Sequence, residues 1–232
     1  MPGQYLRGAL VELVPTGLVP VPNIVIFQYN PESLVHSWSQ AEAPKSSNTE
    51  AVGNPLAVEG APGEAFSFTI AMDASDTIAD GGFTVDLAKV SGIYSRIAAL
   101  EMLMYPSQAA GGALLGLVSA SIASLAGKSV KRKVPFSVMP TVLFVWGAGR
   151  IVPVRVTTLT ITEKLYDPFL NPIHAEAQIG LRVLTQDELA HDTDTLAPVA
   201  NAVYLYTMGL RQALAVANLA NAVESVIGML PL

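Results

Sequence analysis

The sequence predicts an α+β protein built mainly from antiparallel strands, with one packed helix and a second helix at the C-terminal end. Six or seven short segments rich in branched and aliphatic residues are bounded by proline and glycine, as strands usually are. The last three follow one another without a helix between them, which favours antiparallel pairing. Two longer segments, 84–106 and 197–229, have the periodicity or the composition of helices.

The composition limits the classes of function that this chain can have. Of its 232 residues 51% are apolar and only 14% are charged, whereas a typical soluble domain carries about 25% charged residues. A surface so poor in charge predicts that other subunits or lipid cover part of it. The net charge of −6 argues against nucleic-acid binding, which normally needs a basic face. The absence of cysteine excludes disulfides, thiolate catalysis and cysteine-based metal sites.

The N-terminal part of the chain contains four predicted strands and one predicted long loop. The strands are expected at 6–15, 23–29, 33–39 and 65–73, and the loop at 40–64. Between the second and third strands lies Asn30-Pro31, where proline interrupts the ladder and asparagine can bond its own backbone to set a turn. In the fourth strand Phe66, Phe68 and Ile70 share one face, which predicts a strand buried on one side.

The central helix is predicted over 84–106 because its apolar residues recur at helical spacing. Thr84 can cap its start, and Pro106 ends it. The apolar stripe consists of Phe83, Leu87, Val90, Ile93, Tyr94, Ile97, Leu100 and Met104.

The following segment, 107–139, is unusual in its charge pattern. Residues 109–127 carry no charge, and a basic cluster at 128–133 follows, which is the outline of a membrane span with a positive flank. However, glycine, alanine and serine dominate the uncharged part, whereas spans are rich in large apolar residues. A loop that is flexible or covered by a partner is therefore favoured, and a membrane-associated binding module using 109–133 remains the alternative.

Three consecutive strands are expected after this loop, at 141–147, 150–167 and 173–184. The third alternates most cleanly between apolar and polar residues. Its apolar face contains Ala175, Ala177, Ile179, Leu181 and Val183, and the apolar residues of the second strand are Val154, Val156, Leu159 and Ile161.

The C-terminal part is predicted to be a solvated acidic linker followed by a helix over 197–229. From Leu196 onward the only charged residues are Arg211 and Glu224. A helix that is apolar almost all round must be buried. We therefore expect it to pack on a neighbouring subunit or on the outer face of its own fold. The asparagines along it make a bilayer span less attractive.

No constellation in the sequence indicates catalysis. His36, His174 and His191 share no ligand spacing, and no third metal ligand lies near any of them. The serines lack a GxSxG context, and the glycine-bearing segments lack a phosphate-loop pattern. We therefore expect no catalytic residue, no metal and no cofactor.

Two parts of the sequence carry motifs that belong together. The early part is an aromatic strand that ends in F-x-[YF]-N-P, and the later part contains P-x-[VL]-x-F-x-W-G, an aromatic-Asp-x-F turn and P-[IV]-x-A. The residues at these positions are Phe27, Tyr29, Asn30 and Pro31; Pro140, Val142, Phe144, Trp146 and Gly147; and Tyr166, Asp167, Phe169, Pro172 and Ala175. In this order the motifs resemble the tube-type domain of contractile injection systems. Within that family the chain is most similar to the baseplate adaptor that normally carries a LysM module.

The resemblance implies a β-barrel or sandwich of the phage tail-tube type, assembled as a homo-hexameric ring around a channel. This domain would span 1–186, with loop excursions at 40–64 and 107–139. Residues 187–232 would add a linker and an apolar helix in place of the LysM module. The implied partners are an Hcp-like inner tube protein, a VgrG-like spike protein, and baseplate wedge and sheath proteins. Assembly is expected in the bacterial cytoplasm, as part of an injection particle.

The resulting hypothesis is a structural protein, not an enzyme: a ring adaptor that joins the inner tube to the spike and initiates tube assembly. An inner tube subunit proper is the alternative within this class, although the extra C-terminal helix counts against it. Neither nucleic acid nor membrane is expected as a partner. The candidates for structural motif or subunit interface are Phe27, Tyr29, Asn30, Pro31, Trp38, Phe144, Trp146, Gly147, Tyr166, Asp167, Phe169, Pro172, Leu210, Leu214, Leu219 and Val223.

Overall fold

A computed structural model describes most of the predicted elements. The described residues are 5–13, 23–40, 56, 58, 60–75, 91–105, 139–191 and 196–227, and for 220–227 the backbone alone. Most of the predicted loops 40–64 and 107–139, the basic cluster and the predicted cap Thr84 lie outside them.

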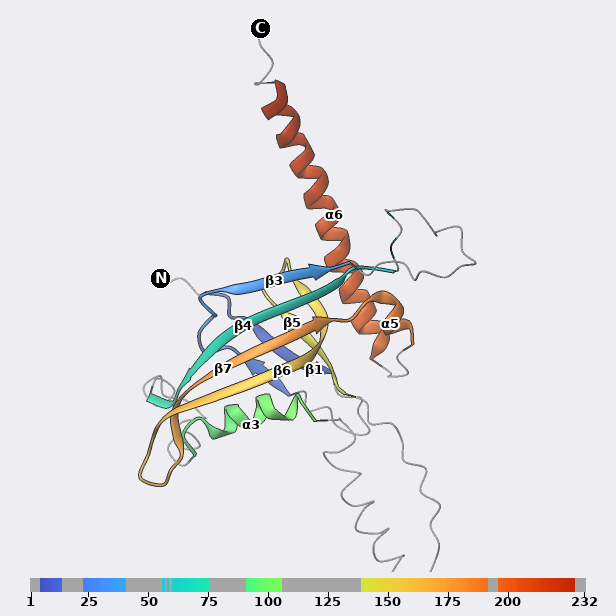
Figure 1. Cartoon of the computed structure of the whole chain (residues 1–232). Helices are drawn as coiled ribbons and strands as arrows, with labels where there is room; N and C mark the ends of the chain where they lie inside the picture. The colour runs from blue at the N-terminus through green and yellow to red at the C-terminus, as the bar shows by residue number, and fades with distance from the viewer. Residues whose placement is uncertain are drawn as a thin grey trace, which may run out of the picture.

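Within these residues the chain forms seven strands and three helices (Figure 1). The predicted strands coincide with the observed ones to within a few residues at each end. The strands are β1 (Ala9–Leu13), β2 (Ile24–Ile26), β3 (Leu34–Ser39), β4 (Gly63–Asp73), β5 (Thr141–Val145), β6 (Ile151–Tyr166) and β7 (Pro172–Val183); the helices are α3 (Tyr94–Met102), α5 (Gln186–Ala190) and α6 (Ala197–Ile227).

All seven strands belong to one antiparallel sheet, which confirms the predicted pairing. Their order is β2-β1-β5-β6-β7-β4-β3, and every neighbouring pair is antiparallel. In the part of the chain that the structure describes, β2 and β3 are edge strands and do not pair with each other. The sheet is therefore not closed, so the chain by itself does not form a complete barrel.

The sheet is nevertheless strongly curled. Strands β5 and β4 are separated by β6 and β7, so a flat sheet would hold them about 14 Å apart. The ring of Phe144 on β5 instead lies 5.2 Å from that of Phe66 and 5.4 Å from that of Phe68, both on β4. The concave face of the curl therefore closes upon one aromatic core, which continues to Phe27.

The inward face of β6 changes register half-way along the strand. Val154 and Val156 are buried, and after a bulge between Val156 and Thr158 the residues that pack on the core are Leu159 and Ile161. The bulge shifts the alternation along the strand by one residue. This explains why two of these predicted core residues have even numbers and the other two have odd numbers. Opposite the bulge lies Gly180, where an added Cβ would come within 2.3 Å of the Thr158 hydroxyl.

Helix α3 buries Ile93, Ile97 and Leu100, as the periodicity predicted, whereas Tyr94 is exposed. The helix begins at Tyr94 because Gly92, just before it, has a φ of 57° that interrupts the α-helical conformation. The N–H of Ile93 donates to the carbonyl of Pro172 at the start of β7. This contact fixes one end of the helix against the sheet.

The segment predicted to be a solvated acidic linker contains a helix, so that prediction is wrong for residues 186–190. Helix α5 begins with a capping box, in which the Thr185 hydroxyl accepts from the N–H of Glu188 and the Glu188 carboxylate accepts from the N–H of Thr185. Leu189 is buried beneath it. The pattern Thr-x-x-Glu was the local signal for this helix.

The first half of α6 packs on its own fold, and the next residues project from it (Figure 1). Ala200 and Thr207 are buried, and the Thr207 hydroxyl donates to the carbonyl of Ile151 on β6 at 2.5 Å. By contrast, every residue from 212 to 219 is exposed. The helix was predicted to pack on a neighbouring subunit or on the outer face of its own fold. Its first half does pack on its own fold, whereas residues 212–219 are exposed.

Substitution of Gly92 with alanine is expected to destabilise the fold more than the same substitution at Gly147. Both glycines have a positive φ, 57° and 72°, which adds about 1–2 kcal/mol for any other residue. An added Cβ at Gly92 would also lie 2.2 Å from the carbonyl oxygen of Pro172, whereas nothing lies within 4 Å of one at Gly147. Equal losses of unfolding free energy in urea titrations would contradict this account of the contact between α3 and β7.

Candidate interaction site

The connection between the two edge strands carries the Phe-Gln-Tyr-Asn-Pro motif. The side chain of Phe27 is buried, with ring centroids 5.3 Å from Phe68 and 6.4 Å from Trp146. Its N–H donates to the carbonyl of Gly8, which extends the pairing of β1 with β2 by one step. The motif therefore begins inside the core and leads outward.

Asn30 fixes the outer end of the motif, but not by bonding its own backbone as the sequence suggested. Its side-chain amide donates to the carbonyl of Leu6 at 2.8 Å and accepts from the N–H of Gly8 at 2.9 Å. Since an amide side chain carries both a donor and an acceptor, it can replace a missing strand residue. Asn30 thus holds the chain that leads into β1.

Gln28 makes the corresponding contact on the opposite side. Its amide donates to the carbonyl of Asp73 and accepts from the N–H of the same residue, both at 2.9 Å. The guanidinium of Arg96 on α3 donates to the same Gln28 oxygen at 2.9 Å. We call Gln28 and Asn30 the amide clamp, because they join the connection between β2 and β3 to the end of β4 and to the start of β1.

Gly8 is a part of this site that the sequence did not indicate. An added Cβ would lie 2.7 Å from the ring of Phe27 and 2.8 Å from that of Trp146. The backbone of Gly8 can approach both rings because it carries no side chain. Gly8 and Trp146 are far apart in the sequence, so their proximity in the fold could not be predicted from either segment.

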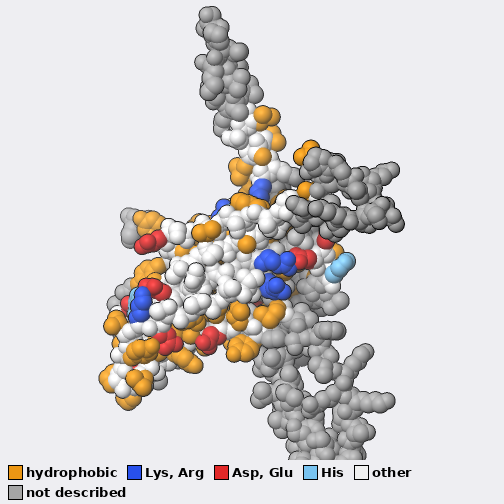
Figure 2. Space-filling model, viewed as in Figure 1, with side chains coloured by type: hydrophobic (Ala, Val, Ile, Leu, Met, Phe, Trp, Pro, Cys, Tyr) orange, Lys and Arg blue, Asp and Glu red, His pale blue; other side chains and the backbone are white. Residues whose placement is uncertain are grey.

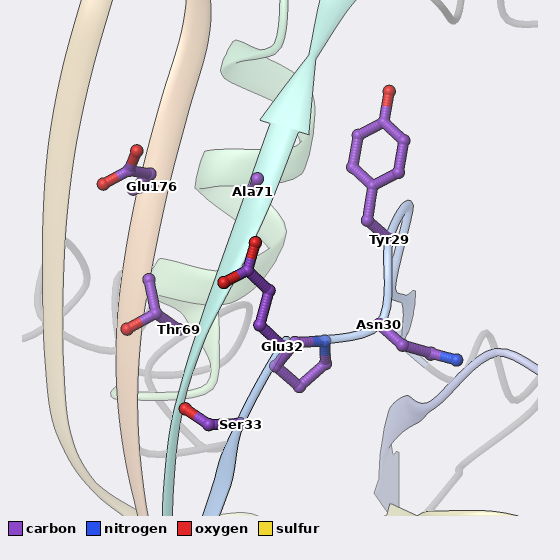
Figure 3. A pocket seen from close by; sticks show the side chains of 8 residues that line it. Tyr29, Asn30, Glu32, Ser33, Thr69, Ala71 and Glu176 are labelled. Atoms are coloured by element: carbon purple, nitrogen blue, oxygen red, sulfur yellow. The ribbon is translucent and has the colours of Figure 1, made fainter.

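A pocket of about 530 Å³ opens beside the amide clamp (Figure 3). The Glu32 carboxylate lies beside β4, and Asn30 points away from the strand (Figure 3). The second carboxylate, Glu176, is paired with Lys164 at 2.5 Å. The lining combines carboxylates and hydroxyls, so it favours polar or cationic contacts. It consists of Tyr29, Asn30, Pro31, Glu32, Ser33, Thr69, Ala71 and Glu176.

A buried carboxylate anchors α6 to the sheet. Glu64, on β4, forms a two-fold hydrogen bond with the guanidinium of Arg211 and accepts from Nε2 of His36 at 2.6 Å. Burial alone would raise the pKa of Glu64, but the hydrogen bonds from Arg211 and His36 outweigh it and hold that pKa below its usual value. Burial, together with the nearby charges of Arg150 and Arg211, lowers the pKa of His36 and outweighs the opposite effect of Glu64, so the imidazole is neutral at pH 7.

The turn between β6 and β7 presents apolar side chains on a well-ordered frame. The Asp167 carboxylate accepts from the N–H groups of Phe169 and Asn171, and from the Asn171 side chain. Phe169 and Leu170 are 85% and 79% exposed. Hydrophobic side chains gather at this tip and along α6 (Figure 2). Since the turn is held without these two side chains, they are available to a partner.

The predicted motif and interface residues differ in burial. Phe27, Phe144 and Pro172 are buried and Trp146 packs on the core, so these residues shape the fold and do not form an outer surface. Gly147 has a positive φ at the turn between β5 and β6, and the side chain of Val223 lies outside the described residues. Three candidates are half-buried, namely Pro31, Asp167 and Leu210. The exposed candidates are Tyr29, Asn30, Trp38, Tyr166, Phe169, Leu214 and Leu219.

The three histidines lie apart and have different surroundings. His36 stacks between Trp38 and Phe66, with ring centroids 3.6 and 4.1 Å away. His174 lies 3.3 Å from the carboxylate of Asp73, and His191 caps the end of α5. Among the residues that the structure describes, no group of three or more His, Asp and Glu side chains is arranged to hold a metal ion. Over the same residues, no helix is both long enough and apolar enough for a membrane crossing.

Removal of the amide clamp is expected to destabilise the fold. Gln28→Ala should lower the free energy of unfolding by about 1–3 kcal/mol, because it leaves partly buried backbone groups of Asp73 unpaired. Asn30→Ala should lower it by about 0.5–1.5 kcal/mol, since Asn30 is exposed and water can replace it. Gln178→Ala, an exposed position on β7, should stay within about 0.5 kcal/mol. Equal values for all three variants in denaturant titrations would contradict the clamp.

Acidification is expected to lower the melting temperature in two steps. The folded pKa of His36 is below the ordinary histidine value of 6.5, so the unfolded chain binds more protons and stability falls as the pH drops below about 6.5. The pKa of Glu64 is below the ordinary glutamate value of 4.5, so a second loss of stability follows below about 4.5. His36→Gln should remove most of the loss between pH 7 and pH 5. An unchanged profile would show that His36 does not contribute to it.

The sequence matches no protein-family model, and no curated protein matches it.

Proposed function

We propose that the protein is a structural subunit of a contractile injection system, a hexameric ring adaptor that joins the inner tube to the spike and initiates tube assembly. One observation supports this most. The two halves of the sequence resemblance, around Phe27 and around Phe144 and Trp146, meet in one aromatic cluster inside a curled antiparallel sheet. Such a curl is a suitable unit for a tail-tube barrel.

The edges of the sheet support ring assembly. Ile24 and Ile26 on β2 are 50% and 59% exposed, and Val35 and Trp38 on β3 are 59% and 56% exposed. An apolar edge strand is a template for pairing with another chain. A chain with one such edge on each side can form a heterologous contact with two neighbours, and such contacts close into a ring.

The remaining exposed surfaces fit contacts between layers. The tip that carries Phe169 and Leu170 extends beyond the sheet (Figure 1), where an Hcp-like tube or a VgrG-like spike ring would stack. The apolar stretch of α6 follows the sheet in the chain, at the position where members of the resembled family carry a LysM module. These surfaces would otherwise expose large apolar side chains to water.

The full chain is expected to form rings of six subunits with an open channel in electron micrographs, alone or with co-expressed tube and spike proteins. Ile24→Lys with Ile26→Lys should abolish the rings, because lysines on an edge strand oppose pairing with a neighbour. Gln178→Lys, on the central strand β7, should leave them intact.

Particles with another symmetry, or a monomer under all of these conditions, would contradict the proposed adaptor. Stacked rings of the chain alone, without added tube protein, would favour the inner tube subunit instead. Rings that persist in the double lysine variant would show that β2 is not part of the subunit contact.

A further inference from the structure

Helix α6 presents one face to its own sheet. Ala200, Tyr204, Thr207 and Arg211 make this contact, through burial, packing on the core, or hydrogen bonds to Ile151 and Glu64. Because successive residues of a helix are about 100° apart, these four side chains point within about 60° of one another. We call this side of the helix the body face.

Two other sides of α6 are largely apolar and wholly or partly exposed. Face A contains Val199, Val203, Tyr206, Leu210 and Leu214, and face B contains Leu205, Val216 and Leu219 together with the polar residue Gln212. By the same geometry, face A is centred about 90° from the body face on one side and face B about 125° on the other. The helix therefore has three contact directions. Its own fold occupies the body face and reaches part of face A, where the Tyr206 hydroxyl donates to the carbonyl of Ala148 and Leu210 lies near Gly149.

The exposure of these two faces is large. On face A, Tyr206 and Leu214 are 54% and 61% exposed, and on face B, Val216 and Leu219 are 69% and 63% exposed. At the base of face A, Val199, Val203 and Tyr206 form an apolar groove of about 420 Å³ with Ile151. Both faces continue past Arg211, the last described contact of the helix with the sheet, onto the part that projects (Figure 2).

We infer that the occupant of both faces is the same helix of neighbouring copies of this chain, so that the α6 helices form a parallel ring. This inference rests on the proposed hexamer. Face A of one helix would pack on face B of the next, a heterologous contact that uses two different faces and leaves the body face on the sheet. A single foreign helix in a groove would cover one face and leave the other in water.

The charge distribution agrees with contacts between identical helices. The sequence has no charged residue between Arg211 and Glu224, so parallel copies bring no like charges together along this stretch. Arg211 itself is neutralised within its own subunit by Glu64. Alanine at 213, 215 and 217 separates the large side chains and permits close approach of neighbouring helices.

Cysteine cross-linking tests the parallel ring directly, because the chain contains no cysteine of its own. In a parallel ring, Leu214 on face A and Val216 on face B of the next helix differ in height by only about 3 Å. The full chain carrying Leu214→Cys with Val216→Cys should form, under mild oxidation, a ladder of cross-linked species that ends at six. A second double variant, Leu214→Cys with Leu219→Cys, tests for a larger shift of one helix relative to the next along the helix axis. Leu214→Cys alone is the matched control and should stay uncross-linked.

The outcomes separate this inference from the proposed function. Dimers from the single variant would overturn it, because they indicate a two-fold contact of face A with itself. Six-fold rings in micrographs with no ladder from either double variant would overturn the helix ring but not the hexamer. A ladder that ends at another number would support the helix contact and contradict six-fold symmetry. If the chain binds to phosphatidylglycerol vesicles and the cross-linked ladder is then lost, this would show that lipid covers these faces instead of neighbouring helices.

Discussion

The amide clamp is the interaction on which the curled sheet depends most. The connection between β2 and β3 leads from one edge of the sheet to the other, and a connection without fixed contacts would allow the curl to open. Gln28 and Asn30 supply backbone-like hydrogen bonds at the two ends of this connection. Because Arg96 bonds the same Gln28 oxygen, the clamp also connects the sheet to α3. These hydrogen bonds surround the aromatic core and lie almost entirely outside it.

The second organising contact joins the sheet to α6. Glu64 is buried in β4, where an unpaired carboxylate would be strongly unfavourable, so Arg211 and His36 are required as partners. Trp38, on the exposed edge strand, stacks on the same His36. The position of α6 and the shape of the β3 edge therefore both depend on the buried carboxylate of Glu64. This coupling fits an assembly in which the edge strands and the helix meet the same neighbours.

Much of the fold was predictable from the sequence, because period-two alternation and proline or glycine at the ends mark strands reliably. Ile179 and Leu181 on β7, for example, lie where the alternation places them. The sheet order was not predictable, since it depends on pairing between segments such as β1 and β5 that are distant in the sequence. The two partners of Asn30 were missed for the same reason. The helix α5 was missed although Thr185 and Glu188 carried its capping signal.

The bond between Arg211 and Glu64 also controls the direction in which the outer part of α6 projects. The sixteen residues of α6 beyond Arg211 extend about 24 Å as an α-helix. A rotation of the helix by about 5° about this bond would move its far end by about 2 Å, which is comparable to the gap between a packed and an unpacked helix pair. A two-fold hydrogen bond to a rigid guanidinium restricts such a rotation better than a single contact would. Subunits that carry this bond would present their helices at nearly the same angle before they meet.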